Sequence, residues 1–350
     1  MNYLSNKLSK ALNIPPFTNT KKSSSLTPSA SSVEINLPDG TKKVVGSCHR
    51  QQYYKIKGYN EDSDGIVNID WTLAAIMGDH MHNMLNKLID DYGFPMGIQK
   101  LSSEHAIFNK ELNFSGRSDI IAWDVSKNEP IGIEIKSIGE FKAKKAMEQP
   151  IEEHVIQSVI YLDFYNRNII PGQKKITKWY IWYISRTENW SIKAKEHGSP
   201  FTMLWDFCIR LEKGVPIISL PNGVEQEWKD YSVENIYKRY DLLLSYIKTD
   251  TLPPRDYDIK YSEEKITGLY KQNKISKKTD IAYIESWIKK GAPEGKLKVE
   301  MGDSECMFCE YKKRCWENIT NDKQKRFSNL PLDVDKNLPK TKGESTLDFL

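Results

Sequence analysis

The spacing of apolar residues along the chain predicts where its helices lie. Between residues 71 and 92, apolar side chains recur every three or four positions, which is the period of a helix with one buried face. The same pattern predicts helices over residues 144–167, 201–212, 233–247 and 279–290.

Strand-like runs lie between the first two of these helices. Residues 105–114, 118–125 and 131–136 are short and β-rich, and the turn sequences Ser-Gly-Arg and Ser-Lys-Asn-Glu-Pro separate them, so we expect two successive hairpins. Residues 176–185, which read ITKWYIWYIS, carry the strongest strand pattern in the chain. The order helix, three strands, helix, strand predicts an α/β core.

Changes in composition divide the chain. Residues 1–34 are rich in Ser and Lys and predict a flexible tail, whereas one domain is expected over residues 35–317. Within it, residues from about 187 to 302 read as a mostly helical insertion. Residues 318–343 predict a linker, and residues 344–350 a short apolar peptide.

Composition allows a sizeable core and limits the partners. The 350 residues are 39% hydrophobic, and a net charge of +4 permits a nucleic-acid partner without requiring one. Nowhere do eighteen uncharged apolar residues run together, so no membrane partner is expected. We expect a cytoplasmic protein, with mitochondrial or nuclear import as the alternative because the N-terminal tail is free of acidic residues before Glu34.

Three polar residues suggest metal-assisted chemistry. Asp119 follows a Gly-Arg-Ser turn, and Glu134 and Lys136 share one face of the next strand because side chains alternate along a strand. Carboxylates bind the hard divalent cations that activate water for phosphodiester cleavage, and a lysine beside them would steady that water. An ordinary hairpin with a surface ion pair is the alternative that the spacing leaves open.

The surrounding motifs resemble, in order, those of RecB-like PD-(D/E)XK nucleases. The matching segments are Gly78 to His82, Gly116 to Asp119, Ile133 to Ser137, and Gln157 to Tyr161. The resemblance implies a restriction-endonuclease-like core, a mixed β-sheet flanked by helices. It also implies that Asp119, Glu134 and Lys136 are catalytic.

The same resemblance implies binding roles. The ligands of Mg²⁺ or Mn²⁺ would be His82, Asp119, Glu134 and Ile135, and the DNA contacts would be Gln157, Tyr161, Arg117 and Ser137. His80 is the rival of His82, although two residues along a helix it projects from a different face. Gln157 and Tyr161, four positions apart, also fit a polar helix face with a buried tyrosine.

Four of the five cysteines form a split pattern. Cys306, Cys309 and Cys315 are spaced C-x2-C-x5-C, and Cys48 stands far upstream. Four thiolates hold either a [4Fe–4S] cluster or Zn²⁺, so spacing leaves the metal open. The pattern resembles the iron–sulfur subset of the same family, which includes AddB subunits and CRISPR-associated exonucleases, and this favours a [4Fe–4S] cluster. Cys208, among apolar residues, reads as a small buried hydrophobe.

Basic and aromatic residues flank these cysteines. Arg50, Tyr53 and Tyr54 follow Cys48, and residues 312–314 read Lys-Lys-Arg. Charge and rings together suit single-stranded DNA, and a solvated basic loop is the alternative.

The C-terminal peptide places Leu347, Phe349 and Leu350 at the end of a polar linker. It is similar to the tails by which phage polymerases and transcription factors dock on sliding clamps, so a clamp is an expected partner. A tail that folds back on the domain is the alternative.

Together these features predict a metal-dependent deoxyribonuclease, an exonuclease acting on single strands or free ends in replication, recombination or repair. A phage origin would place it in the host cytoplasm. Residues 291–296 are too short for a Walker A motif, so any helicase would be a separate chain. The alternatives are a catalytically silent iron–sulfur protein that binds DNA or a clamp, and a CRISPR spacer-processing nuclease.

Overall fold

A computed structural model of the protein describes residues 26–59, 61–62, 69–110, 112–169, 171–186, 203–220 and 222–316. The predicted linker 318–343 and the predicted clamp peptide 344–350 lie outside these residues. Within the described part of the chain, no helix has both the length and the apolar composition needed to cross a membrane.

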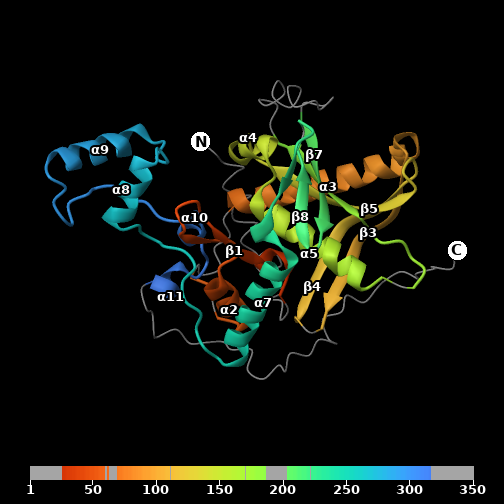
Figure 1. The fold of residues 1–350 in the computed structure, drawn as a ribbon, viewed down its shortest axis with the longest axis horizontal. Coiled ribbons are helices and arrows are strands. Elements are labelled where there is room, and N and C mark those ends of the chain that lie inside the picture. Colours follow the sequence, from red (N-terminus) through yellow and green to blue (C-terminus); the bar gives the residue numbers. More distant parts are fainter. Residues whose placement is uncertain are drawn as a thin grey trace, which may run out of the picture.

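A seven-stranded mixed sheet forms the centre of the molecule (Figure 1), in the order β3-β4-β5-β6-β7-β8-β9. The strands are β3 (Ile98–Asn109), β4 (Phe114–Asp124), β5 (Glu129–Ile138), β6 (Lys178–Ser185), β7 (Leu204–Glu212), β8 (Val215–Ser219) and β9 (Glu225–Glu227). Only β5 and β6 pair in parallel among these neighbours. The predicted α/β class, a mixed sheet flanked by helices, is confirmed.

Smaller elements surround this sheet. A separate antiparallel pair is formed by β1 (Ser32–Asn36) and β2 (Lys42–Gly46). The helices are α2 (His49–Ile56), α3 (Ile69–Met96), α4 (Glu140–Glu148), α5 (Glu152–Arg167), α7 (Val233–Lys248), α8 (Glu263–Lys271), α9 (Lys278–Lys289), α10 (Ser304–Met307) and α11 (Lys312–Trp316). The short 3-10 turns are η1 (Pro28–Ala30) and η3 (Lys229–Tyr231). The helices expected over 71–92, 233–247 and 279–290, and the strands expected over 105–114, 118–125, 131–136 and 176–185, are confirmed with shifted ends.

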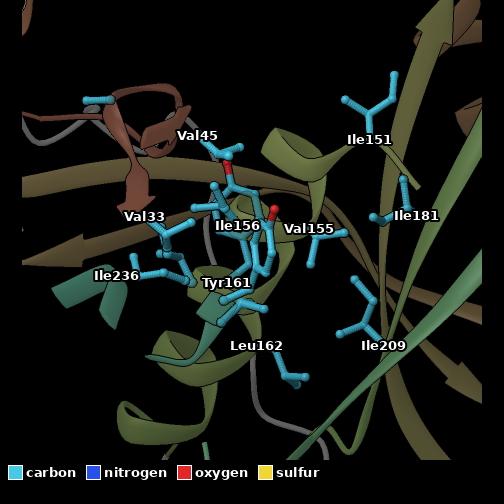
Figure 2. Packing of buried hydrophobic residues seen from close by; sticks show 14 of the residues in the cluster. Val33, Val45, Ile151, Val155, Ile156, Tyr161, Leu162, Ile181, Ile209 and Ile236 are labelled. Atoms are coloured by element: carbon cyan, nitrogen blue, oxygen red, sulfur yellow. The ribbon is translucent and has the colours of Figure 1, made fainter. Parts of the chain in front are cut away.

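Helices cover both faces of the sheet. On one face, Leu85 and Ile89 of α3 pack against Ile120 and Ile135. On the other face lies α5, which in Figure 2 is enclosed between sheet residues such as Ile181 and a layer that contains Val33 of β1 and Ile236 of α7. Apolar residues occur nearly all round α5 because both of its sides are buried.

The helix predicted over residues 201–212 is wrong, because this segment is strand β7. Leu204, Phe207, Cys208 and Leu211 have helical spacing, which suggested a helix. The buried residues are instead Trp205, Phe207 and Ile209, which alternate as in a strand and pair with β6. The first described part of the expected helical insertion therefore extends the sheet.

Two predicted boundaries also need correction. The helix expected over 144–167 is two helices, α4 and α5, because Pro150 cannot continue a helix and disfavours helical backbone in the residue before it. The tail was expected to reach residue 34, yet Leu26 is fully buried and bridges to Phe114 of β4. Ordered structure therefore begins earlier than the Ser-rich composition predicts.

Candidate active site and cysteine centre

The candidate active site lies where β4 and β5 separate. Their ladder ends at the pair Ile120 and Ile133. Beyond that pair, the Asp119 carboxylate accepts a hydrogen bond from the backbone amide of Ile135 at 2.6 Å. A side chain thus takes the place of a β4 backbone carbonyl, which satisfies the buried amide and leaves an opening between the strands.

Glu134 and Lys136 point to the same side of β5, as period-two geometry predicts. The Lys136 ammonium donates to Glu134 Oε1 at 2.7 Å and to Gln157 Oε1 at 2.9 Å. Glu134 is only 2% exposed, and its burial raises its pKa to about 7 against the opposing charge of Lys136. Its second oxygen, Oε2, is buried and has no hydrogen-bond partner among the described residues.

Helix α3 brings His82 to this opening. His82 Nδ1 lies 3.6 Å from Asp119 Oδ1, whereas His80 is exposed. Burial of the ring lowers the pKa of His82, but the hydrogen bond and charge of Asp119 outweigh it and the net shift is upward. Gly78 lets the helix approach, because a Cβ there would lie 3.1 Å from Ser137 Oγ.

A chain of hydrogen bonds supports Lys136 from behind. Gln157 donates to the Tyr161 hydroxyl at 3.2 Å, and that hydroxyl donates to the Arg117 carbonyl at 2.7 Å. Tyr161 is 2% exposed, and Gly116 makes room for its ring. Direct contact between Tyr161 and DNA does not fit this burial, so a binding role would be exerted through Gln157 and Arg117.

The side chain of Arg117 is exposed at the same edge. It is 59% exposed and lies 3.8 Å from Glu104, a residue of β3 with a left-handed backbone (φ 51°). Ser137 faces α3 instead, beside Gly78. Of these two predicted DNA contacts, Arg117 has the more accessible side chain.

One cation near this edge was not singled out from the sequence. Arg186 directly follows β6, donates to the Ala74 carbonyl of α3 at 3.4 Å and lies against Gly139. Its Nε is buried without a hydrogen-bond partner among the described residues. The only signal in the sequence is its position after the strongest strand.

The acids and imidazole meet in pairs. Within the described ranges, no three His, Cys, Asp or Glu side chains are grouped closely enough to hold a metal ion. His82 faces Asp119, while Glu134 faces Lys136. The oxygen and imidazole donors nevertheless share one opening, and they are the ligand types that Mg²⁺ and Mn²⁺ accept.

The four spaced cysteines line one cavity. Cys48 caps the start of α2, Cys306 lies in α10, Cys315 lies in α11, and Cys309 lies between those two helices. Three cations, Arg50, Arg255 and Lys312, line the same cavity. Residues more than 250 positions apart are therefore brought together, beside these cations and the carboxylate of Glu305.

Several contacts orient these sulfur atoms. The Arg50 guanidinium lies 3.9 Å from Cys315 Sγ, and the Tyr311 amide donates to Cys309 Sγ at 3.4 Å. Burial, together with neighbouring thiols, raises the pKa of Cys306 to about 11 and that of Cys309 to about 12. Metal binding at this centre would therefore release protons.

The aromatic residues next to Cys48 are not a DNA-stacking surface. Tyr53 and Tyr54 are buried, and the Tyr54 ring packs 5.2 Å from Tyr59 and 5.5 Å from Tyr311. The expectation that they stack on single-stranded DNA is wrong, because these rings belong to the main apolar core, against which Cys309 and Cys315 pack. Cys208 lies elsewhere, on β7 opposite Tyr180 of β6.

No family model matches the chain, and no curated protein matches it.

Proposed function

We propose that this protein is a metal-dependent DNA nuclease of the RecB-like PD-(D/E)XK kind. The observation that carries the proposal is the convergence of His82, Asp119 and Glu134, with Lys136 beside them, at the opening between β4 and β5. These residues come from three elements, and the sequence motifs occur in the matching order. A chance surface ion pair would not require such burial.

The types of donor at this opening suit a hard divalent cation. Asp119, Glu134, His82 and the Ile135 carbonyl would hold it, and the unpartnered Glu134 Oε2 is a buried acceptor that lacks a donor. When bound, Mg²⁺ or Mn²⁺ polarises the phosphate and lowers the pKa of the attacking water. Lys136 is held by Glu134 and Gln157 where its ammonium can orient that water and stabilise developing negative charge.

In the proposed reaction, the water oxygen bonds to phosphorus and the bond to the leaving sugar oxygen breaks. One proton from the water is lost to solvent or a nearby base, and the leaving oxygen gains one. Arg117 is exposed beside the opening and would contact a phosphate, while the buried Tyr161 positions Gln157. Single strands or free DNA ends are the proposed substrates.

The cysteine centre supports the second part of the proposal, a [4Fe–4S] cluster held by Cys48, Cys306, Cys309 and Cys315. The support is their shared cavity, which is lined by three cations and by Glu305. The role proposed is structural, because the four ligands connect the two ends of the described chain. A Zn²⁺ site is the alternative, and the ultraviolet–visible spectrum of anaerobically purified protein separates the two.

The decisive test is cleavage of end-labelled single-stranded DNA with Mn²⁺. Glu134→Ala should lower the rate by ~10³-fold or more, because it removes a carboxylate ligand of the metal. Glu129→Gln is the matched control on the same strand, since Glu129 pairs with Lys178 away from the opening, and it should cleave normally.

The Lys136→Met variant provides a second test of the site. It should lower the rate by ~10²-fold or more and leave DNA affinity near normal, because the ammonium acts on the reacting water. Cleavage that persists in both variants would reject the site assignment. A wild-type protein that binds DNA and never cuts it would instead favour the silent accessory protein.

A further inference from the structure

A pair of helices beyond the sheet forms a second unit, which we call the lysine hairpin. It comprises α8, α9 and the segment that follows them, residues 263–298. Its small core is built from Ile266, Ile275 and Ile284, with Val299 at its end. Figure 1 shows α8 and α9 lying apart from the sheet, so most of their surface is not covered by the main core.

This hairpin carries the positive charge of the protein. Residues 263–298 contain nine Lys and five Asp or Glu, which gives a net charge of +4. The whole chain also has a net charge of +4, so all other residues together sum to zero. The mild basicity of the protein is therefore concentrated in one small unit.

The acids of the hairpin are largely engaged within it. Glu263 accepts hydrogen bonds from the backbone amides of residues 295 and 297, at 3.2 and 3.0 Å. Asp280 pairs with Lys277, and Glu285 accepts from the Tyr270 hydroxyl. These three carboxylates have partners within the hairpin, and Glu264 and Glu294 carry its other two negative charges.

Seven of the nine lysines have no ion-pair partner among the described residues. Lys271, Lys274 and Lys278 lie at the turn between α8 and α9, and Lys289, Lys290, Lys296 and Lys298 lie at the other end of α9. All seven are exposed. The twelve residues of α9 span ~18 Å, the length of about five phosphate intervals along one strand of B-DNA.

An aromatic ring lies between the two lysine groups. Tyr283, near the middle of α9, is 55% exposed although it is a large apolar side chain. Exposed rings beside positive charge are the surface on which bases of single-stranded nucleic acid stack. This feature favours a nucleic acid over an acidic protein as the partner.

We propose that the lysine hairpin binds the phosphates of a nucleic-acid strand and holds the part of the substrate that lies outside the active site. The identity of the polymer as DNA rests on the proposed nuclease function. Lysine contacts of this kind release condensed counterions, so they determine the salt dependence of binding.

The test is fluorescence anisotropy with a labelled single strand of ~30 nucleotides, titrated over a range of NaCl concentrations. Buffer without divalent cations prevents hydrolysis. The triple variant K271Q/K274Q/K278Q should lower the slope of log affinity against log salt by about 2, since each lost contact removes ~0.7. K289Q/K290Q/K296Q should do the same independently, so the test survives misfolding of one triple.

The matched control is K42Q/K87Q/K229Q, which neutralises three exposed lysines that already pair with Glu34, Asp91 and Glu227. Its slope should equal that of the wild type. An unchanged slope in both hairpin triples, or an equal fall in the control, would overturn the proposal. The proposal would also be overturned if the hairpin triples bind DNA normally but no longer bind polyglutamate. That result would assign the surface to an acidic protein.

Failure of this proposal is distinguishable from failure of the nuclease proposal. If the wild-type protein never cleaves DNA but both hairpin triples have a lower salt slope than the wild type, the nuclease proposal fails and the hairpin proposal stands. If the wild-type protein cleaves DNA and both triples keep the wild-type slope, the hairpin proposal fails and the nuclease proposal stands.

Discussion

The carboxylate site and the cysteine centre both collect residues from separate parts of the chain, but different forces hold them. The carboxylate site is built on β4, β5, α3 and α5, at the second and third strands of a seven-stranded sheet. Ladder hydrogen bonds and two apolar cores fix these elements whether or not an ion is bound. Its geometry is a property of the sheet.

The cysteine centre has much less secondary structure beneath it. Helices α10 and α11 are four and five residues long, and isolated helices of that length are unstable in water. A few bonds connect the two chain segments, such as that from the Asp62 amide to the Glu310 carbonyl at 2.6 Å. We infer that the stability of this centre would depend on the metal proposed for it far more than that of the carboxylate site would.

The largest effect should follow from removing a cysteine ligand. Cys306→Ser should lower the free energy of unfolding by ~3 kcal/mol or more, because a structural metal contributes directly to folding. Cys208→Ser is the control, since Cys208 lies on β7 away from the centre, and it should cost less than ~1 kcal/mol. Urea unfolding and metal analysis measure both; equal metal content in the two variants would contradict the dependence.

The sequence also predicts the geometry of the carboxylate site better than that of the cysteine centre. Side-chain alternation along a strand placed Glu134 and Lys136 on one face, and a hairpin placed Asp119 close to them, because such relations are local. Cys48 and Cys315 share a cavity through contacts across the whole domain, and only the resemblance to a family suggested it. The helix predicted in place of β7 was wrong because its apolar residues fit both periods.

Side-chain burial was the hardest feature to predict. Tyr161 follows Gln157 by one helical turn, so spacing alone allowed it to face DNA. Its burial arises because its ring packs 5.7 Å from Trp179 of β6 and its hydroxyl reaches the Arg117 carbonyl of β4, and no local pattern reveals that this face of α5 lies against the sheet. Tyr54 likewise seemed available for stacking because its ring partner Tyr311 lies far away in the sequence.

A smaller effect should distinguish the cysteine centre from the carboxylate site by how their contributions to stability change with pH. His49, next to Cys48, is 2% exposed, and burial together with the charge of Arg239 lowers its pKa to about 4 from 6.5. Its neutral form stabilises the folded state above pH 6.5, and that contribution is lost as pH falls through 4. The expected loss is ~3 kcal/mol, since each pKa unit corresponds to ~1.4 kcal/mol.

Urea unfolding of wild type and His49→Gln between pH 7.5 and pH 4 measures this loss, and the variant should show a flatter profile. His82 in the carboxylate site gives the opposite sign, because its raised pKa makes its contribution fall as pH increases. His82→Gln should therefore not flatten the acid limb. Parallel profiles for wild type and His49→Gln would remove this difference between the regions.

The smallest effect concerns the support behind Lys136. Tyr161→Phe removes the hydroxyl that joins Gln157 to the Arg117 carbonyl and leaves both buried groups short of a partner, so stability should fall by ~1 to 2 kcal/mol. Tyr165→Phe, one turn further along α5, is the control, because its hydroxyl is not part of this chain of hydrogen bonds. If Tyr161 only positions Gln157 and Lys136, kcat should fall severalfold while KM for DNA stays constant. A rise in KM with unchanged kcat would mean instead that the Tyr161 hydroxyl reaches the DNA, and that α5 must move away from β4 when substrate binds.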